Sequence, residues 1–290
     1  MNLEKMERFT LRIDENAYGK INLALDVLYR RDDGYHEINS VMQQISLHDT
    51  LIIREGGKGV EIECDNHLVP LDHTNLVHRA WNEISRLTGT RTGIRVQIHK
   101  RIPVAAGLAG GSTNGAAVLK GLNTMWDLGL NQKDLMEIGG RIGADIPFCI
   151  LGGTALAEGI GERLTRLKSL KDKHILLANP GTGISSAYAY RKLTIPEDHK
   201  GMDPIVQCIE KDDLKCLAGE MFNIFEGAII PENPIIGDIK AIMEDNGALG
   251  ALMSGSGASV FGLYDDVDKL EFTMKKLQKD LPYVFHVRTI

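Results

Sequence analysis

A glycine-rich segment near the middle of the chain has the residue types of a phosphate-binding loop. The segment Pro103–Asn114 is PVAAGLAGGSTN and lies between an expected strand and an expected helix. Its three glycines let backbone N–H groups approach an anion without a Cβ in the way. Ser112 and Thr113 add hydroxyls at the helix N-terminus, which favours negative charge. We interpret the segment as a phosphate loop; a flexible glycine-rich turn is the alternative.

Other nucleotide-binding motifs do not occur in the sequence. A Walker A loop ends in Gly-Lys-Ser/Thr, and this tripeptide is missing. No Gly-x-Gly-x-x-Gly motif is followed by an acidic residue at dinucleotide spacing, and the protein-kinase tripeptides HRD and DFG are missing too. Any kinase encoded here must therefore use another class of phosphate loop.

The elements that position this loop change in character along the 290 residues. Alternating apolar residues predict strands at Phe9–Ile13, Ile21–Tyr29, Ile38–Leu47, Thr50–Arg54, Val60–Cys64, Ile94–Ile98, Thr154–Ala157, Ile175–Ala178, Gly250–Ser254, Val260–Tyr264 and Val284–Thr289. Helical spacing and caps predict helices at Asn75–Thr88, Ser112–Leu128, Asn131 to about Gly143, Ser186–Leu193, Pro204–Phe225, Pro234–Asn246 and Val267–Lys279. Ile146-Pro147 is expected to end the helix that begins at Asn131, because the residue before a proline disfavours helix.

This order predicts an α+β fold with two lobes, because strands dominate the first third and helices interleave with strands later. We place the boundary near Ala157–Arg166, which divides the chain into residues 1–160, with the phosphate loop, and residues 161–290.

Charge and composition narrow the classes of partner. The chain has 33 Lys and Arg against 39 Asp and Glu, a net charge of −6, which argues against broad nucleic-acid binding. The two charge-free windows, Ile102–Leu119 and Asn246–Tyr264, are broken by glycines, so no membrane span is expected. The sequence leaves the oligomeric state open, a weak homodimer included.

The cysteines and the first residues favour a cytoplasmic protein. No two of the four cysteines have CxxC spacing, so we expect reduced thiols rather than a zinc knuckle or a redox motif. The first fifteen residues are charged and lack the apolar core of a signal peptide. No metal-binding cluster is visible, and we name no protein ligand for a metal.

Three segments together resemble the GHMP kinase superfamily, which includes galactokinase, homoserine kinase and mevalonate kinase. These are Ala17–Leu23 (AYGKINL), the phosphate loop, and Leu252–Val260 (LMSGSGASV), in this order over nearly the whole chain. The resemblance implies a two-lobed GHMP kinase fold. Its N-terminal lobe is of the ribosomal protein S5 domain 2 type, its C-terminal lobe is ferredoxin-like, and the site lies between them.

Within the superfamily, three shorter motifs are similar to the 4-diphosphocytidyl-2-C-methyl-D-erythritol kinase family. They are Lys20-Ile-Asn22, Asp33-Gly-Tyr-His-Glu37 and Gly143-Ala-Asp-Ile-Pro147. The resemblance implies ATP-dependent phosphorylation of the 2-hydroxyl of the erythritol unit, in the non-mevalonate isoprenoid pathway. Mg²⁺ is expected as part of the ATP complex.

The resemblance also implies roles for individual residues. Asp145 becomes the catalytic carboxylate, where a turn-forming acid is the simpler interpretation. Lys20 becomes its cationic partner, where a strand-end lysine is the alternative. Asn22 lies on the same strand face as Lys20 and becomes a substrate-binding residue. Tyr35 and His36 are expected to recognise cytosine.

The remaining predicted site residues follow from the same motifs. In the C-terminal lobe, Ser186 and Tyr190 are expected to bind substrate, Tyr190 as the second aromatic around the base, with Tyr188 close by. ATP binding is assigned to Pro103, Val104, Ala105, Ala106, Gly107, Leu108, Ala109, Gly110, Gly111, Ser112 and Thr113, and to Asn75 and Lys100 for adenine.

Three positions depart from the family's usual pattern without removing a functional group. Ala109 stands where glycine is frequent, and Gly115 and Gly19 stand where alanine is usual. Two other functions remain open at this point. A kinase for homoserine or mevalonate is disfavoured by Gly34-Tyr-His36, and a non-catalytic nucleotide-binding module is disfavoured by the presence of Lys20 and Asp145.

Overall fold

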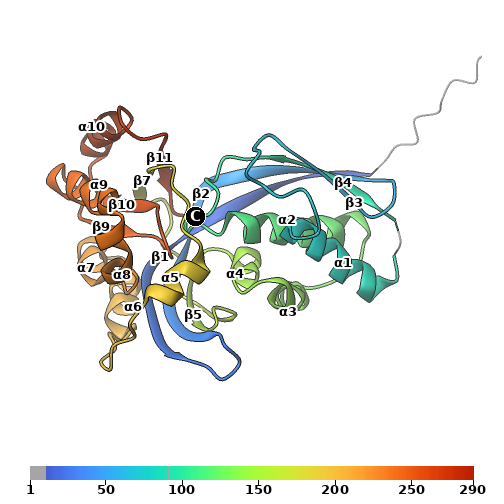
Figure 1. The fold of residues 1–290 in the computed structure, drawn as a ribbon, viewed down its shortest axis with the longest axis horizontal. Helices are drawn as coiled ribbons and strands as arrows, with labels where there is room; N and C mark the ends of the chain where they lie inside the picture. Colours follow the sequence, from blue (N-terminus) through green and yellow to red (C-terminus); the bar gives the residue numbers. More distant parts are fainter. Residues whose placement is uncertain (1–10, 91) are drawn as a thin grey trace, which may run out of the picture.

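Two long antiparallel strands, β1 (Arg12–Arg30) and β2 (His36–Glu55), connect the two halves of the molecule (Figure 1). The computed structural model describes residues 11–90 and 92–290. Each strand was predicted as two shorter runs, and Phe9, in the first run, lies outside the described residues. The runs join because register shifts, such as the one between Tyr18 and Lys20, absorb the breaks in alternation.

These two strands belong to a seven-stranded sheet with the order β3-β4-β2-β1-β8, to which β5 and β6 are attached through β2. The other strands of this sheet are β3 (Val60–Cys64), β4 (Ile94–His99), β5 (Thr154–Gly159), β6 (Arg163–Arg166) and the two-residue β8 (Phe222–Asn223). β6 and β8 were not predicted. Because both strands follow residue 160, this sheet contains residues from both sides of the boundary proposed from the sequence. The boundary itself stays a prediction.

Four helices pack on one face of this sheet and enclose an apolar core. They are α1 (Leu76–Thr88), α2 (Gly110–Met125), α3 (Gln132–Ile142) and α4 (Ile146–Leu151). Local signals set their ends: Asn75 caps α1, and Gly89 ends it with φ at +70°, a conformation that glycine adopts freely. Pro147 does not simply end α3, as predicted, but lies in the first turn of a new helix, where its missing N–H costs nothing.

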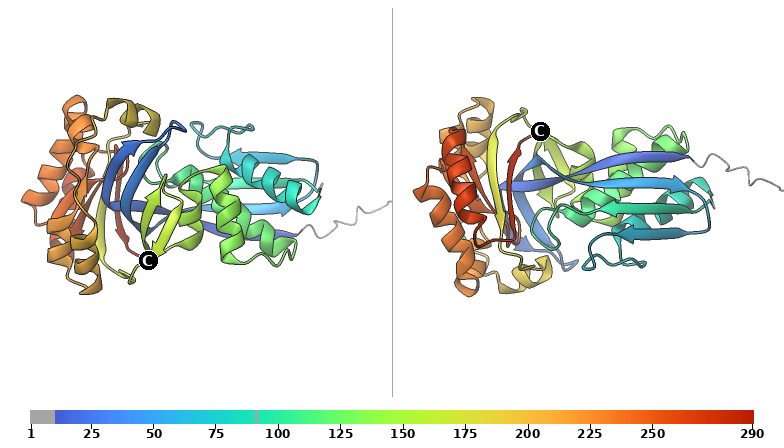
Figure 2. Two further views of the ribbon diagram at one scale, coloured as in Figure 1. Left: turned by 90° about the horizontal axis from the view of Figure 1, so that it is seen from below. Right: turned by 90° about the horizontal axis from the view of Figure 1, so that it is seen from above.

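The C-terminal half builds a four-stranded antiparallel sheet with the order β11-β7-β10-β9. Its strands are β7 (His174–Asn179), β9 (Gly250–Met253), β10 (Val260–Tyr264) and β11 (Tyr283–Arg288). Its helical segments are α5 (Ser186–Lys192), α8 (Glu226–Ile229), the 3-10 turn η1 (Ile230–Glu232), α9 (Pro234–Asp245) and α10 (Val267–Leu277). Figure 2 shows this sheet, yellow to red, facing the blue β1–β2 hairpin.

The prediction of one continuous helix over Pro204–Phe225 is wrong. Two short helices, α6 (Asp203–Glu210) and α7 (Leu214–Glu220), occupy the segment and are followed by β8. The chain turns at Asp212, which has φ at +53°, and Asp213 then caps α7 by accepting from the N–H of Cys216. The four charged residues Glu210–Asp213 form this turn and interrupt the apolar spacing of the segment.

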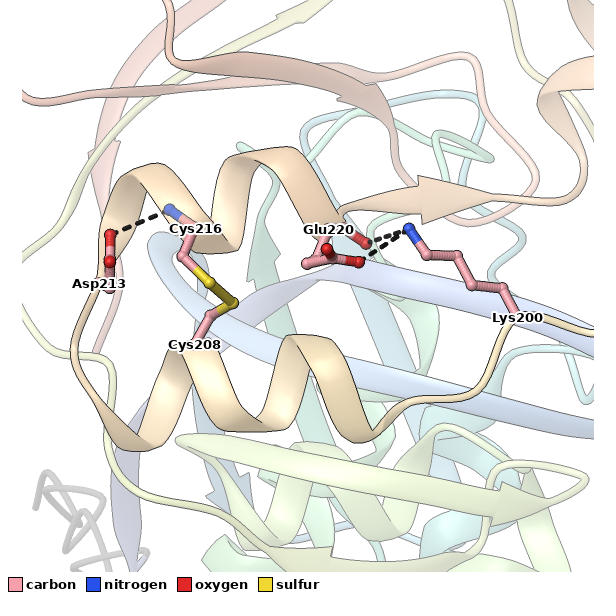
Figure 3. The surroundings of a disulfide bond; sticks show 5 residues. All are labelled: Lys200, Cys208, Asp213, Cys216 and Glu220. Atoms are coloured by element: carbon pink, nitrogen blue, oxygen red, sulfur yellow. Dashed lines mark hydrogen bonds and ion pairs between the residues drawn. A yellow bond between two sulfur atoms is a disulfide. The ribbon is translucent and has the colours of Figure 1, made fainter.

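A disulfide between Cys208 and Cys216 joins α6 to α7 (Figure 3). The expectation that these thiols are reduced is therefore wrong for this pair, which the turn brings together across eight positions of sequence. Cys64 and Cys149 are free.

The two halves share an apolar cluster. Ile21 and Leu23 of β1 lie in it together with Leu177, Phe261 and Leu263 of the second sheet. The chain after β11 also bonds to the first sheet, since the N–H of Ile290 donates to the carbonyl oxygen of Gln44 on β2. Across residues 11–90 and 92–290, no helix is both long and apolar enough to cross a membrane.

Candidate active site

A cavity of about 1200 Å³ lies where the two halves meet. The predicted residues that line it are Lys20, Asn22, Tyr35, His36, Ala105, Ala106, Gly107, Ala109, Gly110, Gly111, Ser112, Asp145, Ser186 and Tyr190. A smaller cavity of about 170 Å³ is lined by Asn75, Lys100, Pro103 and Val104, and by part of the same loop. The structure thus gathers residues from five separate segments around one space.

Two predicted loop residues do not line either cavity. Leu108 is buried in the shared apolar cluster, and its carbonyl oxygen accepts from the N–H of Lys20 at 3.2 Å. Thr113 is buried as well, and its hydroxyl donates to the carbonyl oxygen of Tyr18 at 2.7 Å. Both residues therefore attach the loop to β1.

The loop itself runs from the end of β4 to the start of α2 with several left-handed residues. Ala105, Gly107 and Ala109 have φ of +52°, +75° and +57°. The value at Ala109 explains why glycine is frequent there, because a Cβ is costly in this conformation. A Cβ on Gly107 would lie 2.0 Å from the carbonyl oxygen of Ser254, so the loop approaches the turn between β9 and β10 as closely as two backbones can.

A buried aspartate that sequence reasoning missed holds both ends of the loop. One oxygen of Asp49 accepts from the N–H groups of Arg101 and Ile102 at 2.8 and 2.9 Å. The other accepts from the ammonium of Lys100 at 2.6 Å and from the amide of Asn114 on α2 at 2.9 Å. The carboxylate thereby joins β4, the start of the loop and the first turns of α2.

The sequence did contain a signal for Asp49. It lies on β2 in the same alternation as Leu47, Leu51 and Ile53, which all point into apolar cores. An acidic residue in a buried register of a strand requires partners, because an unpaired buried charge is costly.

Lys20 and Asp145 face the same cavity from different elements. Lys20 lies on β1, and its ammonium donates to Oδ1 of Asn22 at 2.7 Å. Asp145 precedes α4 and is half-buried. No ion pair joins these two groups among the residues that the structure describes, so the proposed partnership would act across the cavity. Burial, and to a smaller extent the charge of Asp145, raises the pKa of the neighbouring Cys149 thiol to about 12. This cysteine is therefore unreactive.

Aromatic rings form the other side of the cavity. The rings of His36 and Tyr190 stack with their centroids 4.6 Å apart, and Phe225 meets Tyr190 edge-on. Tyr35, predicted to stack on cytosine opposite Tyr190, lies at the rim with 59% of its surface exposed. His36 therefore covers one face of Tyr190, the ring on which the prediction places the base.

Two pKa shifts describe the surroundings of these rings. Burial, followed by the charge of Asp145, raises the pKa of Tyr190 to about 12. Burial, and to a smaller extent the charge of the nearby Arg30 guanidinium, lowers the pKa of His36. Tyr190 thus lies within electrostatic reach of Asp145, and the imidazole of His36 is neutral at pH 7.

The cavity is also lined by polar residues that were not among the predicted site residues, although Ser256 lies in the Leu252–Val260 motif. Arg30, Arg191 and Ser256 are among them. No motif indicated the two arginines, which adjoin the predicted aromatic segments. Among the described residues, no group of three or more His, Cys, Asp and Glu side chains could hold a metal ion.

Family models match both halves of the chain. The GHMP kinases N terminal domain matches residues 75–153, and the GHMP kinases C terminal domain matches residues 205–282. A 4-diphosphocytidyl-2-C-methyl-D-erythritol kinase of Acetivibrio thermocellus is 43% identical over 90% of this chain and 92% of its own length. A kinase of the same name from Alkaliphilus metalliredigens is 44% identical over 92% of each chain. This chain belongs to the 4-diphosphocytidyl-2-C-methyl-D-erythritol kinase family.

Solved structures agree with this assignment. A crystal structure of 4-(cytidine 5'-diphospho)-2C-methyl-D-erythritol kinase is similar with a TM-score of 0.81 and 30% identity, over 96% of this chain and 99% of the other. Homoserine kinase from Cytophaga hutchinsonii has a TM-score of 0.77 at 19% identity, over 100% of this chain and 97% of the other. The second likeness concerns the fold alone. The expected two-lobed GHMP kinase fold is confirmed.

Proposed function

We propose that the protein transfers the γ-phosphate of ATP to the 2-hydroxyl of 4-diphosphocytidyl-2-C-methyl-D-erythritol, in the non-mevalonate route to isoprenoid precursors. One observation carries the proposal: the phosphate loop, Lys20, Asp145 and the stacked rings of His36 and Tyr190 line one cavity. Membership of the family supplies the identity of the acceptor. The site of action we propose is the cytoplasm, where ATP is available.

ATP would bind with its phosphates on the loop and its base in the smaller cavity. The backbone N–H groups of Gly110 and Gly111 begin α2, a helix of 16 residues whose N-terminus favours anions. The smaller cavity adjoins this end and contains Asn75 and Lys100. Mg²⁺ would enter as the ATP complex, with phosphate and water oxygens as its main ligands.

Asp145 would act on the acceptor hydroxyl. Its carboxylate would accept the hydrogen bond of the 2-hydroxyl and direct the oxygen at the γ-phosphorus. The new O–P bond forms as the bond to the β-phosphate oxygen of ADP breaks, and the hydroxyl proton passes to Asp145 and then to solvent. The ammonium of Lys20 would offset the negative charge that gathers at the transferred group.

The cytosine of the acceptor would bind on Tyr190, with Tyr35 on its other face. For this the imidazole of His36 must leave the ring it now covers and turn to the polar edge of the base. Because hydrogen bonds rather than stacking distinguish one base from another, we assign base selection to His36. Ser186, at the start of α5, and Asn22 would contact the rest of the acceptor.

The alternative kinases are excluded by an assay of the acceptor. The purified protein is incubated with ATP, Mg²⁺ and one of three alcohols: the cytidyl substrate, homoserine or mevalonate. We expect phosphorylation of the cytidyl substrate only. Turnover of homoserine or mevalonate without turnover of the cytidyl substrate would refute the proposed function, and turnover of none would favour a nucleotide-binding module.

A matched pair of variants tests the role of Asp145. Asp145→Asn should lower kcat by about 10²–10⁴-fold, the contribution of a positioned base, and should leave ATP binding intact. Glu137→Gln removes an exposed carboxylate on α3 that pairs with Arg141, and should leave kcat unchanged. A normal kcat in Asp145→Asn would remove this residue from the mechanism.

A further inference from the structure

We propose that Ser40 is a positioning residue for phosphoryl transfer, acting on Lys20 through Asn22. The ammonium of Lys20 donates to Oδ1 of Asn22 at 2.7 Å, and Nδ2 of Asn22 donates to the hydroxyl oxygen of Ser40 at 2.8 Å. The Ser40 hydroxyl donates in turn to the carbonyl oxygen of Ala24 at 2.6 Å. The proposal rests on the proposed function for the reaction it serves.

The two ends of this series of hydrogen bonds, the Lys20 ammonium and the Ala24 carbonyl oxygen, determine which group donates in each bond. A carbonyl oxygen can only accept, so the Ser40 hydroxyl proton points to Ala24. The Ser40 oxygen is then left to accept, which requires the NH₂ group of Asn22 to face it. An ammonium can only donate, which independently requires the oxygen of the Asn22 amide to face Lys20. Both ends therefore select the same orientation of the amide.

Burial makes this orientation costly to lose. Lys20, Asn22 and Ser40 are 6%, 1% and 0% exposed, so water does not replace a missing partner readily. Among the described residues, Asn22 is the one side chain within hydrogen-bond distance of the Lys20 ammonium. Without the acceptor at Ser40, an N–H group of Asn22 loses its buried partner, and the amide is no longer held from both sides in contact with the ammonium.

The arrangement also has a consequence for substrate. The amide of Asn22 has two N–H groups, and Ser40 accepts from one of them. The second N–H group remains for the cavity that Asn22 lines. Ser40, on β2, thus fixes the position of a cation and of a donor on β1 without lining the cavity itself.

The test is a double-mutant cycle on kcat. Ser40→Ala removes one oxygen from a buried site and leaves no bulk to accommodate. We expect it to lower kcat by about tenfold and to change the KM for ATP by less than twofold. Because Ser40 acts through Asn22, adding Ser40→Ala to Asn22→Ala should lower kcat no further. Additive losses, or a rise in KM for ATP with a normal kcat, would overturn the proposal.

A matched control separates this effect from general loss of a buried hydroxyl. Thr154 on β5 is also buried, and its hydroxyl donates to the amide oxygen of Gln43 at 2.7 Å; neither residue lines the cavity. Thr154→Val should lower stability but leave kcat unchanged. An equal fall in kcat in this control would show that Ser40 has a merely structural effect.

A structural readout keeps the proposal independent of the acceptor. In a crystal structure of Ser40→Ala, we expect the amide of Asn22 to be displaced and its hydrogen bond with Lys20 to be lengthened or lost. An unchanged contact would refute the role of Ser40, whichever alcohol the wild-type protein phosphorylates. Failure of the wild-type protein to phosphorylate the cytidyl substrate would refute the proposed function alone.

Discussion

The carboxylate of Asp49 and the ammonium of Lys100 lie 2.6 Å apart, and their side chains are 0% and 4% exposed. Each group is thus almost completely removed from water, and each depends on the other. Since Lys100 also lines the smaller cavity, this pair links the stability of the first half to the expected binding of the nucleotide base.

Replacing Asp49 should destabilise the protein strongly. Asp49→Asn leaves the Lys100 charge buried without a counter-charge, which typically costs about 3–5 kcal/mol. The free energy of unfolding in urea measures the effect. Glu61→Gln is the control, since it breaks the exposed ion pair with Arg95 and should cost less than about 1 kcal/mol. Similar losses in the two variants would contradict the importance of the buried pair.

Two glycines of the loop should respond differently to substitution. A Cβ on Gly107 would collide with the Ser254 carbonyl, so Gly107→Ala should lower the melting temperature markedly. At Gly111 the nearest atom is 3.9 Å from the added Cβ, so Gly111→Val should fold normally but obstruct the phosphates of ATP. Thermal unfolding and nucleotide titration distinguish the two effects. Unchanged ATP affinity in folded Gly111→Val would exclude this loop as the phosphate site.

Tyr190 should contribute to binding of the acceptor but not of ATP. Stacking of a base on an aromatic ring contributes roughly 1–3 kcal/mol, so Tyr190→Ala should raise the KM for the cytidyl substrate about 5- to 150-fold. Tyr188→Ala is the matched control, because Tyr188 lies on the same helix but its hydroxyl contacts Glu232 outside the cavity. If the two variants behaved alike in steady-state kinetics, Tyr190 would not be the stacking residue.

His36 should make the folded protein sensitive to acid. Its pKa is lowered by burial and by Arg30, so folding disfavours the protonated ring. The stability that this provides is present above the unfolded pKa of about 6.5 and is lost as the pH falls from there through the folded pKa. His36→Phe keeps a ring on Tyr190 but cannot titrate. Its unfolding free energy should fall less than that of the wild type between pH 7.5 and 5.5, and an equal fall would contradict this assignment.

Reduction of the disulfide should affect stability and not catalysis. The bridge between Cys208 and Cys216 closes a short loop, for which a chain-entropy estimate gives about 2–3 kcal/mol. Neither cysteine lines a cavity of the site. Unfolding with and without a reductant should reveal the loss, while kcat should stay unchanged. A Cys208→Ser/Cys216→Ser variant should be insensitive to the reductant, and a fall in its kcat would connect α6 and α7 with catalysis.

Features with a local cause were predictable from the sequence. Asn75 begins α1 through its side chain, and Gly89 ends it through its left-handed backbone. The residue types of the glycine-rich loop indicated a phosphate site. The break at Asp212 has a local cause as well: the charged residues Glu210–Asp213 interrupt the apolar spacing, and Asp213 caps α7. Caps and runs of charged residues thus mark helix boundaries even where apolar residues lie on both sides of them.

Features with a distant cause were not predictable in the same way. Asp49 and Lys100 are 51 residues apart, and no pattern in either segment indicates that they meet. The stack of His36 on Tyr190 depends on how the β1–β2 hairpin lies against the C-terminal half. The family motifs indicated which residues line the cavity, whereas their contacts depend on packing between segments far apart in the chain.

The strands that pass through both halves have a consequence for how the molecule unfolds. Ile21 and Leu23 of β1 are completely buried against residues of the second sheet, so removing either half would expose this apolar surface to water. The halves are therefore one cooperative unit rather than two modules joined by a linker. Calorimetry should record a single transition. A destabilising substitution in the C-terminal half should lower the temperature at which the phosphate loop and the C-terminal sheet unfold together.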